Sequence, residues 1–120
     1  MDIQIDPGSP HAPYDQDRLQ IIEQVRDGRL IAGTKIPTVR ALAADIGIAP
    51  NTVAKAYREL AEAGVIDTRG KQGTFIAESG DPTRSRAEAA VTRLVRELRE
   101  VGMNNDDVLR LVRAALKAPR

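Results

Sequence analysis

The sequence contains no cysteine, no tryptophan, one histidine and only three aromatic residues, and each shortage excludes a class of protein. Without cysteine there are no disulfides and no thiolate metal sites, so a reducing cytoplasm is the expected compartment. His11 has no second histidine or cysteine with which to bind a metal, so we expect neither a metal site nor another cofactor. With so few aromatic residues the core must be aliphatic, and we expect Tyr57 and Phe75 to lie in it.

Long apolar runs and a strong charge of either sign are also missing. No stretch approaches the ~20 apolar residues that a membrane span requires. The start, MDIQIDPGSP, lacks the basic and apolar segments of a signal peptide, so a soluble protein without membrane contact is expected. Residues 1–80 carry nine basic and eleven acidic side chains, residues 81–120 carry nine and six, and the net charge is +1. Contact with nucleic acid must therefore depend on local arrangement rather than on a strongly basic surface.

Groups that could perform catalysis are equally sparse. Ser9, Ser79 and Ser85 lie in polar segments without a nearby base, and the carboxylates are scattered over predicted helix surfaces. The glycine patterns of phosphate-binding and dinucleotide-binding loops are absent. We therefore expect no enzyme, and the 120 residues suit one small domain with an appendage.

Helical periodicity begins after an N-terminal arm, residues 1–13, in which residues 3–5 could form a strand. Three helices are predicted from apolar spacing and from glycine and proline at their ends. The first is capped by Asp15, the second by Thr38, and the third begins at Pro50. Their predicted ranges are 15–28, 38–46 and 50–63, and the very short turn between the last two is typical of a helix-turn-helix.

A hairpin is predicted directly after the third helix. Val65 and Ile66 begin one apolar β segment, RGKQG forms a turn, and TFIA resumes the β pattern. A hairpin at this place is a wing, so the expected fold is mostly α with a small β wing. Residues 14–78 are the predicted winged helix-turn-helix domain.

Residues 79–120 are predicted to form two amphipathic helices. Asp81 is expected to cap the first and Asn104 the second, with Gly102 between them. Each helix presents an apolar stripe that it cannot bury well alone. We therefore expect this region to pair two copies of the chain through Val91, Leu94, Val95, Leu98, Val101, Val108, Leu111, Val112 and Leu116.

The segment GTKIPTVRALAADIGIAPNTVAKAYRELAEAGVIDTRGKQGTFI resembles the DNA-binding domain of the GntR family of bacterial transcription regulators. That family has a glycine-led turn, an LPS/T-x-R-x-LA second helix, an N-T-V-x-x-A-Y recognition helix and a G-x-G-T-F-V wing. The short two-helix tail resembles the YtrA subfamily, which lacks a large effector domain and is similar in using its tail to dimerise.

The resemblance implies which residues contact DNA. Arg40 is placed against DNA, Asn51 and Thr52 face phosphates and base edges, and Gly73 lies at the wing tip. Where the subfamily has an asparagine, this chain has Ala49, so a helix cap is lost. The complete expected set is Thr38, Arg40, Pro50, Asn51, Thr52, Lys55, Lys71, Gln72 and Gly73, whereas Arg58 could pair with Glu62 instead.

The sequence therefore predicts a dimeric regulator that binds double-stranded DNA at a palindromic operator. The resemblance favours a repressor of its own or a transporter operon, relieved by a small-molecule effector of unknown identity. The alternative is a non-catalytic protein-interaction module that uses the winged helix and the tail helices for assembly. Duplex binding and its loss in Arg40→Ala distinguish the two.

Overall fold

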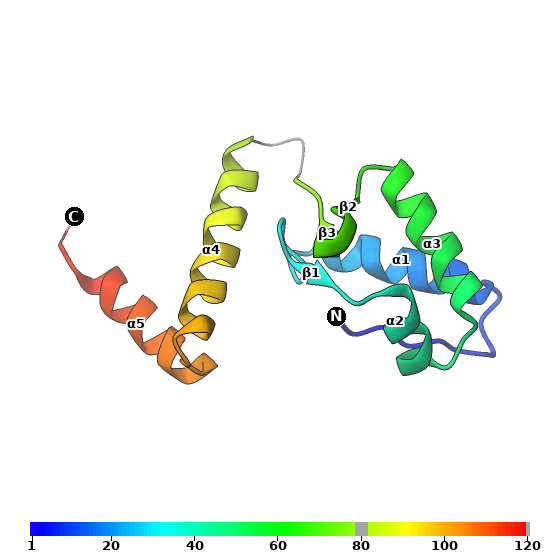
Figure 1. Ribbon diagram of the computed structural model, residues 1–120, viewed down its shortest axis with the longest axis horizontal. Coiled ribbons are helices and arrows are strands. Elements are labelled where there is room, and N and C mark those ends of the chain that lie inside the picture. The colour runs from blue at the N-terminus through cyan, green and yellow to red at the C-terminus, as the bar shows by residue number, and fades with distance from the viewer. Residues whose placement is uncertain (79–81, 120) are drawn as a thin grey trace.

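The computed structural model describes residues 1–78 and 82–119, arranged as a winged helix followed by two tail helices (Figure 1). The expected cap Asp81 lies outside the described residues. The elements, in chain order, are α1 (Pro13–Arg26), β1 (Lys35–Ile36), α2 (Val39–Ile46), α3 (Pro50–Glu62), β2 (Ile66–Thr68), the 3₁₀ turn η1 (Gly70–Gln72), β3 (Thr74–Ile76), α4 (Pro82–Glu100) and α5 (Asn105–Lys117).

The first helix begins two residues before the predicted cap. Its N-cap is Ala12, whose side chain makes no capping bond, and Pro13 occupies the first turn. Proline suits that position because its fixed φ is helical and its missing N–H is not needed there. The prediction that Asp15 caps the helix is therefore wrong, and Asp15 instead pairs with Arg18 at 3.1 Å.

The N-terminal arm is extended but forms no strand, so the predicted β segment at residues 3–5 is wrong. Its backbone bonds to glutamine side chains of α1: Gln24 Nε2 donates to Asp2 O at 2.6 Å and Gln20 Nε2 to Gln4 O at 2.7 Å. Gln16 Oε1 accepts from Asp6 N at 2.7 Å. Four helical residues rise ~6 Å and two extended residues ~6.6 Å, so the two periods match. These side chains supply the bonds that a neighbouring strand would otherwise make.

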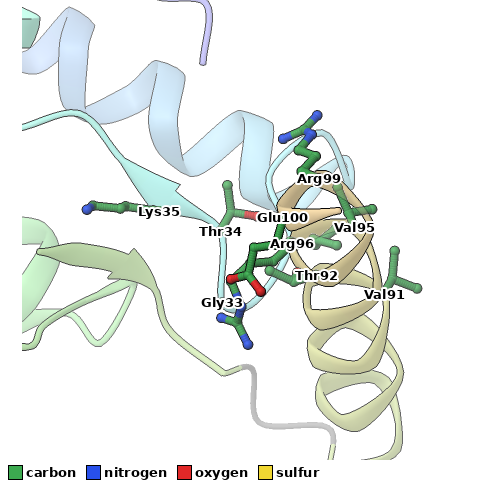
Figure 2. A pocket seen from close by; sticks show the side chains of 10 residues that line it. Gly33, Thr34, Lys35, Val91, Thr92, Val95, Arg96, Arg99 and Glu100 are labelled. Atoms are coloured by element: carbon green, nitrogen blue, oxygen red, sulfur yellow. The ribbon is translucent and has the colours of Figure 1, made fainter. Parts of the chain in front are cut away.

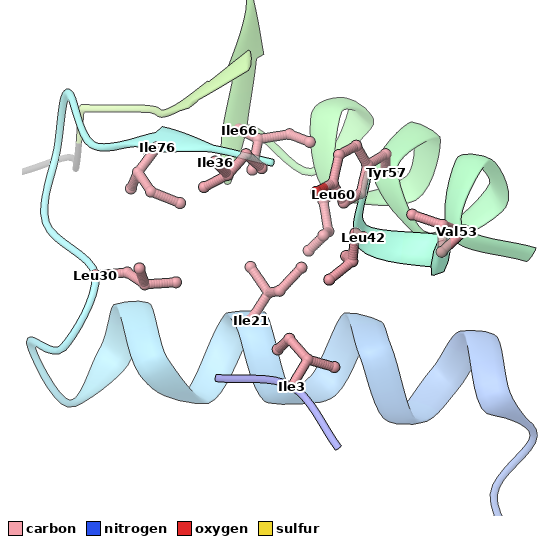
Figure 3. Packing of buried hydrophobic residues seen from close by; sticks show 11 residues of the cluster. Ile3, Ile21, Leu30, Ile36, Leu42, Val53, Tyr57, Leu60, Ile66 and Ile76 are labelled. Carbon is pink, nitrogen blue, oxygen red and sulfur yellow. The ribbon is translucent and has the colours of Figure 1, made fainter. Parts of the chain in front are cut away.

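The aliphatic core lies between α1, α2, α3 and the sheet (Figure 3). Tyr57 belongs to it, as predicted, and its hydroxyl donates to Pro37 O at 2.7 Å. Phe75 does not: its side chain is only partly buried, and the guanidinium of Arg69 lies 4.5 Å from its ring centroid. The fully buried members include Ile21, Leu42, Val53, Leu60 and Ile76.

The wing is part of a three-stranded antiparallel sheet with the order β1-β3-β2. Thr74 of β3 pairs with Thr68 of β2 and with Ile36 of β1. The hairpin was predicted, but the pairing of a further strand, β1, with it was not. Because β1 pairs with β3, the chain before α2 is joined to the wing, and β3 is hydrogen-bonded to a strand on each side.

The two tail helices lie beside the winged helix rather than within its core (Figure 1). Asn104 caps α5 as predicted, its Oδ1 accepting from Asp107 N at 2.9 Å. The nearer helix, α4, contacts the chain between α1 and β1. There Ala32 N donates to Glu88 Oε2 at 2.9 Å, and Thr92 Oγ1 donates to Ala32 O at 3.0 Å.

Candidate nucleic-acid interface

The first helix of the helix-turn-helix presents an uncommitted arginine. Thr38 Oγ1 accepts from Ala41 N at 3.1 Å, which confirms the predicted cap and fixes the start of α2. Arg40 follows in the first turn with an exposed side chain. Within residues 1–78 and 82–119 it has no ion pair or hydrogen bond that would have to break, so its guanidinium is available for a phosphate or a guanine edge.

A left-handed glycine turns the chain from α2 into α3. Gly47 has φ 74°, and its N–H and that of Ile48 both bond to Ala43 O at 3.0 and 3.1 Å. Pro50 starts α3 after Ala49, which makes no side-chain capping bond. The predicted loss of a cap is thus confirmed, and no N-cap side chain covers the backbone at the start of α3.

The start of α3 is open to solvent. Pro50 and Asn51 are exposed and Thr52 is half-buried, while the next residue, Val53, is completely buried. The positive end of the helix dipole at such a terminus favours phosphate. Short polar side chains there can approach base edges when the helix lies in a major groove.

Lys55 is exposed, as predicted, but its ammonium has a partner that the sequence did not indicate. Its Nζ lies 3.8 Å from the ring centroid of Tyr14, at the start of α1. A cation over an aromatic face is stabilised by about 0.5–1 kcal/mol at an exposed site. The contact holds Lys55 beside the exposed start of α3 in the free protein. The alternative pair of Arg58 with Glu62 is not formed in the described structure.

The wing tip combines exposed polar side chains with a constrained glycine. Lys71 and Gln72 are exposed within η1. Gly73 has φ 116° and ψ −163°, a conformation that side-chain-bearing residues scarcely adopt. A Cβ at Gly73 would also lie 2.8 Å from Cε of Lys35. The glycine therefore allows the Lys35 side chain to lie across the wing.

Two cations of this region were missed from the sequence, Lys35 and Arg69. Lys35 reaches the wing tip because β1 pairs with β3, and that pairing leaves no local sequence signal. Arg69 is held on the wing by Asp67, with Nε and Oδ2 3.2 Å apart, and by the ring of Phe75. The wing therefore carries Lys35 and Arg69 in addition to the predicted Lys71.

A buried carboxyl lies beneath α3. Asp17 is fully buried on α1, and neither carboxyl oxygen has a hydrogen-bond partner in the described part of the chain. Burial raises the pKa of Asp17 from 3.8 to about 6. Burial and the negative charge of Asp17 also raise the pKa of Tyr57, which keeps its hydroxyl protonated as the donor to Pro37.

An ion pair on the surface complements this buried contact. Arg18 of α1 lies 3.3 Å from Glu59 of α3, measured from Nε to Oε2. Together with the Tyr57–Pro37 hydrogen bond, this ion pair fixes α3 against α1 and against the chain before α2.

The described residues contain no cluster of three His, Cys, Asp or Glu side chains able to hold a metal ion. None of the described helices is both long and apolar enough to cross a membrane.

Comparison with known proteins decides the family. The family model described as "Bacterial regulatory proteins, gntR family" matches residues 13–76, which span α1 to the end of the wing. The chain belongs to the GntR family. It is accordingly a DNA-binding transcription regulator, and the winged helix is its family domain.

Relatives within the GntR family extend the similarity beyond that domain. The HTH-type transcriptional regulator Rv1152 of Mycobacterium tuberculosis is 47% identical over 97 residues, covering 81% of this chain and 79% of that protein. The HTH-type transcriptional repressor YtrA of Bacillus subtilis is 39% identical over 99 residues, covering 82% and 75%. The similarity to YtrA confirms the resemblance to YtrA-like regulators.

A solved structure shows a similar domain on DNA. The crystal structure of the AraR DNA-binding domain in complex with operator ORX1 has a TM-score of 0.54 and 26% sequence identity to this chain. The matched region covers 62% of this chain and 94% of the AraR chain. The AraR domain that binds this operator is therefore similar in fold to the winged helix of this chain.

Proposed function

We propose that this GntR regulator is a homodimeric cytoplasmic repressor that binds a palindromic operator in its own promoter or in that of a transporter operon. The observation that carries the proposal is the uncommitted guanidinium of Arg40 in the first helix of a helix-turn-helix whose second helix, α3, begins with the exposed residues Pro50 and Asn51. The repressor assignment is supported by the similarity to YtrA of Bacillus subtilis, a transcriptional repressor.

In the proposed complex, α3 enters the major groove by its N-terminal end. Asn51 and Thr52 reach base edges or phosphates, Arg40 contacts a phosphate or a guanine, and Lys55 adds one phosphate contact. The wing contacts the backbone through Lys71, Gln72 and the peptide at Gly73. Because few cations take part, specificity rests on a few short contacts together with DNA shape.

The proposed dimer interface is the apolar face of the tail, residues 79–120. Six large apolar side chains of the tail are exposed, and a large exposed apolar surface often marks a protein-protein interface. A second copy is the proposed occupant because a palindromic operator needs two recognition helices related by two-fold symmetry. These side chains are Val91, Leu94, Val101, Leu109, Leu111 and Leu116.

The expected interface residues differ in how free they are. Val95, Leu98 and Val112 are half-buried, and Val108 is only 8% exposed. Val108 therefore has most of its contacts within its own chain and would add little new burial in a dimer. Leu116, 79% exposed, has the most to gain.

The DNA-binding proposal is tested by selecting genomic duplexes with the purified protein and then measuring their affinity by fluorescence anisotropy. Arg40→Ala is expected to weaken binding by about 5- to 150-fold, the equivalent of about 1–3 kcal/mol. Arg26→Ala, which removes an exposed arginine at the end of α1, is the matched control and should leave the affinity unchanged. A wild-type protein without duplex affinity at low salt, or an unchanged Arg40→Ala, contradicts the proposal.

The regulatory part is tested with the same selected sites. A palindrome recovered upstream of the gene itself or of a transporter operon, with transcription from that template reduced by the protein in vitro, supports the repressor. Raised transcription would show an activator instead. Log affinity against log salt should fall steeply, by about 0.9 for each phosphate neutralised.

The dimer is tested by sedimentation equilibrium. Leu116→Glu places a charge in the proposed interface and should shift the protein toward a monomer. Arg113→Glu alters a neighbouring exposed position of α5 and should leave the dimer intact. A monomeric wild type, or equal effects of the two variants, would sink the dimer proposal.

A further inference from the structure

A cavity of about 630 Å³ lies between α4 and the chain that leads into β1 (Figure 2). Its volume is in the range of small-molecule sites, about 300–1,000 Å³. Residues 33–35 form one side and α4 forms the other, so the cavity lies at the junction of the winged helix and the tail. None of the predicted DNA-contacting residues lines it.

The walls of the cavity are fixed by hydrogen bonds. Ala32 is 1% exposed, and its backbone N–H and C=O both bond to α4, through Glu88 at 2.9 Å and Thr92 at 3.0 Å. Gly33 packs against this contact, since a Cβ there would lie 3.5 Å from Cγ2 of Thr92. The cavity is thus bounded by a defined contact between the two parts of the chain.

The lining combines apolar surface with an excess of positive charge. Ile31, Val91 and Val95 supply apolar surface, and the charged lining residues of α4 are Arg96, Arg99 and Glu100. Arg99 donates to Asn105 Oδ1 at 3.1 Å. Arg96 makes no ion pair or hydrogen bond in the described part of the chain, so its charge is the one available to a ligand.

The third cation of the lining, Lys35, does not direct its charge into the cavity. Lys35 lines it with its stem, but its ammonium points away from α4, toward the wing (Figure 2). Two arginines against one carboxylate leave a net charge of +1. A ligand carrying one negative charge and an apolar body matches this lining.

We infer that the junction cavity is the effector site of this regulator, and that its ligand is a small monovalent organic anion with an apolar body. The effector role rests on the proposed DNA-binding function, whereas the binding of the anion does not. Charge complementarity selects the anion, because an apolar partner helix would leave Arg96 without a counter-charge.

The cavity is also connected to the DNA-binding surface. Gly33 N donates to Ile76 O at 2.9 Å and Ile76 N donates to Thr34 O at 2.8 Å, so the cavity wall continues the sheet into the wing strand β3. A ligand that shifts α4 against residues 33 and 34 therefore acts on the strand that carries the wing. It also changes how the tail, and with it a second copy, is oriented relative to the winged helix.

The binding is tested without DNA, using two fluorescent probes that differ by one charge. They are 8-anilinonaphthalene-1-sulfonate, an organic anion, and N-phenyl-1-naphthylamine, its neutral counterpart. We expect the sulfonate to bind more tightly than the neutral probe, and Arg96→Glu to weaken the sulfonate about tenfold. Arg93→Glu reverses a charge on the same helix outside the cavity lining and is the matched control, with no expected effect.

Three results of the probe titrations would overturn the site. Equal effects of Arg96→Glu and Arg93→Glu would show only a general charge effect. Loss of binding in Leu116→Ser would place the probe on the apolar face of the tail. Sedimentation shows whether the protein is a monomer or a dimer during the titration. Sulfonate binding that appears only when the protein is a monomer would show that a second copy fills the cavity.

The effector role is tested separately by adding the sulfonate to a complex with a selected duplex carrying a red dye. We expect the duplex affinity to change several-fold in wild type and to stay constant in Arg96→Glu, which retains duplex binding. An unchanged affinity in wild type at saturating sulfonate overturns the effector role. Absence of duplex binding without any probe overturns the proposed function instead, and leaves the probe titrations valid.

Discussion

The hydroxyl of Thr92 donates a hydrogen bond of 3.0 Å to the carbonyl oxygen of Ala32, and so joins the tail helix α4 to the winged helix. Glu88, one turn earlier on α4, accepts from the N–H of the same residue at 2.9 Å. Both polar groups of one buried peptide segment are thus satisfied by a helix that lies more than fifty positions later in the chain. The position of the tail relative to the wing depends on this pair of bonds.

Removing the carboxylate of Glu88 should expose the cost of this contact. Glu88→Ala leaves the buried N–H of Ala32 without an acceptor, and we expect a loss of about 1–3 kcal/mol in the free energy of unfolding. Hydrogen exchange at the amide of Ala32 should also be faster in Glu88→Ala than in wild type. Glu97→Ala, at an exposed position of the same helix, is the control. Equal exchange of the Ala32 amide in both variants would show that α4 is held by other contacts.

Asn51 is expected to matter more for DNA recognition than Arg58, although only Arg58 carries a charge. Asn51 lies in the first turn of α3, whereas Arg58 lies two turns further along. Asn51→Ala should cost about 1–3 kcal/mol on a selected operator and reduce its preference over a scrambled duplex. Arg58→Ala should leave that preference intact. The opposite ranking in anisotropy titrations would place the C-terminal half of α3 in the groove instead.

The buried carboxyl of Asp17 should make stability depend on pH. Its pKa is about 6 in the folded protein and 3.8 ordinarily, so the folded state binds more protons between these values. The free energy of unfolding therefore falls as pH rises from about 4 through about 6 and then levels off. A difference of roughly 2 in pKa corresponds to roughly 3 kcal/mol.

Asp17→Asn removes this ionisation without changing the size of the side chain. We expect the variant to be more stable than wild type at pH 8 and to lack the decline between pH 4 and pH 6, as measured by urea unfolding. Asp45→Asn, at an exposed position of α2, should keep the wild-type profile. A pH profile shared by wild type and Asp17→Asn would show that Asp17 stays solvated.

The wing glycine offers a test of backbone strain. Gly73→Ala should lower the free energy of unfolding by about 1–3 kcal/mol, because φ 116° with ψ −163° is accessible essentially to glycine alone. The Cβ would also meet the flexible Lys35 side chain at 2.8 Å. The same substitution in a Lys35→Ala background separates the two causes. We expect no rescue there, and full rescue would assign the cost to the side-chain contact.

Much of the winged helix follows from features that act over a few residues. Thr38 and Asn104 cap their helices, Gly47 turns the chain by its positive φ, and Pro50 begins α3. Such effects involve a side chain and a backbone group within four positions, so the sequence reveals them directly. The one failure of this kind was Asp15, where Pro13 starts the helix earlier.

Contacts between distant segments could not be predicted in the same way. The glutamine side chains of α1 hydrogen-bond to the backbone of the N-terminal arm, Lys55 lies over the ring of Tyr14, and β1 pairs with the wing strand β3. Phe75, predicted for the core, lies partly exposed beneath Arg69 because β3 directs it to the outer side of the sheet. Each of these depends on which faces meet, and apolar or polar character alone does not say that.

The sequence by itself determined the family, the caps at Thr38 and Asn104, the start of α3 at Pro50 and the aliphatic core, because all are local or belong to an ordered series of motifs. Only the tertiary structure decided that Asp17 is buried without a partner and that Ala32 holds α4. It also decided that Arg96 lines a cavity with Gly33 and Thr34. The physical reason is that burial, pKa and cavity shape are properties of surfaces brought together by folding, and residues far apart in the chain contribute to each.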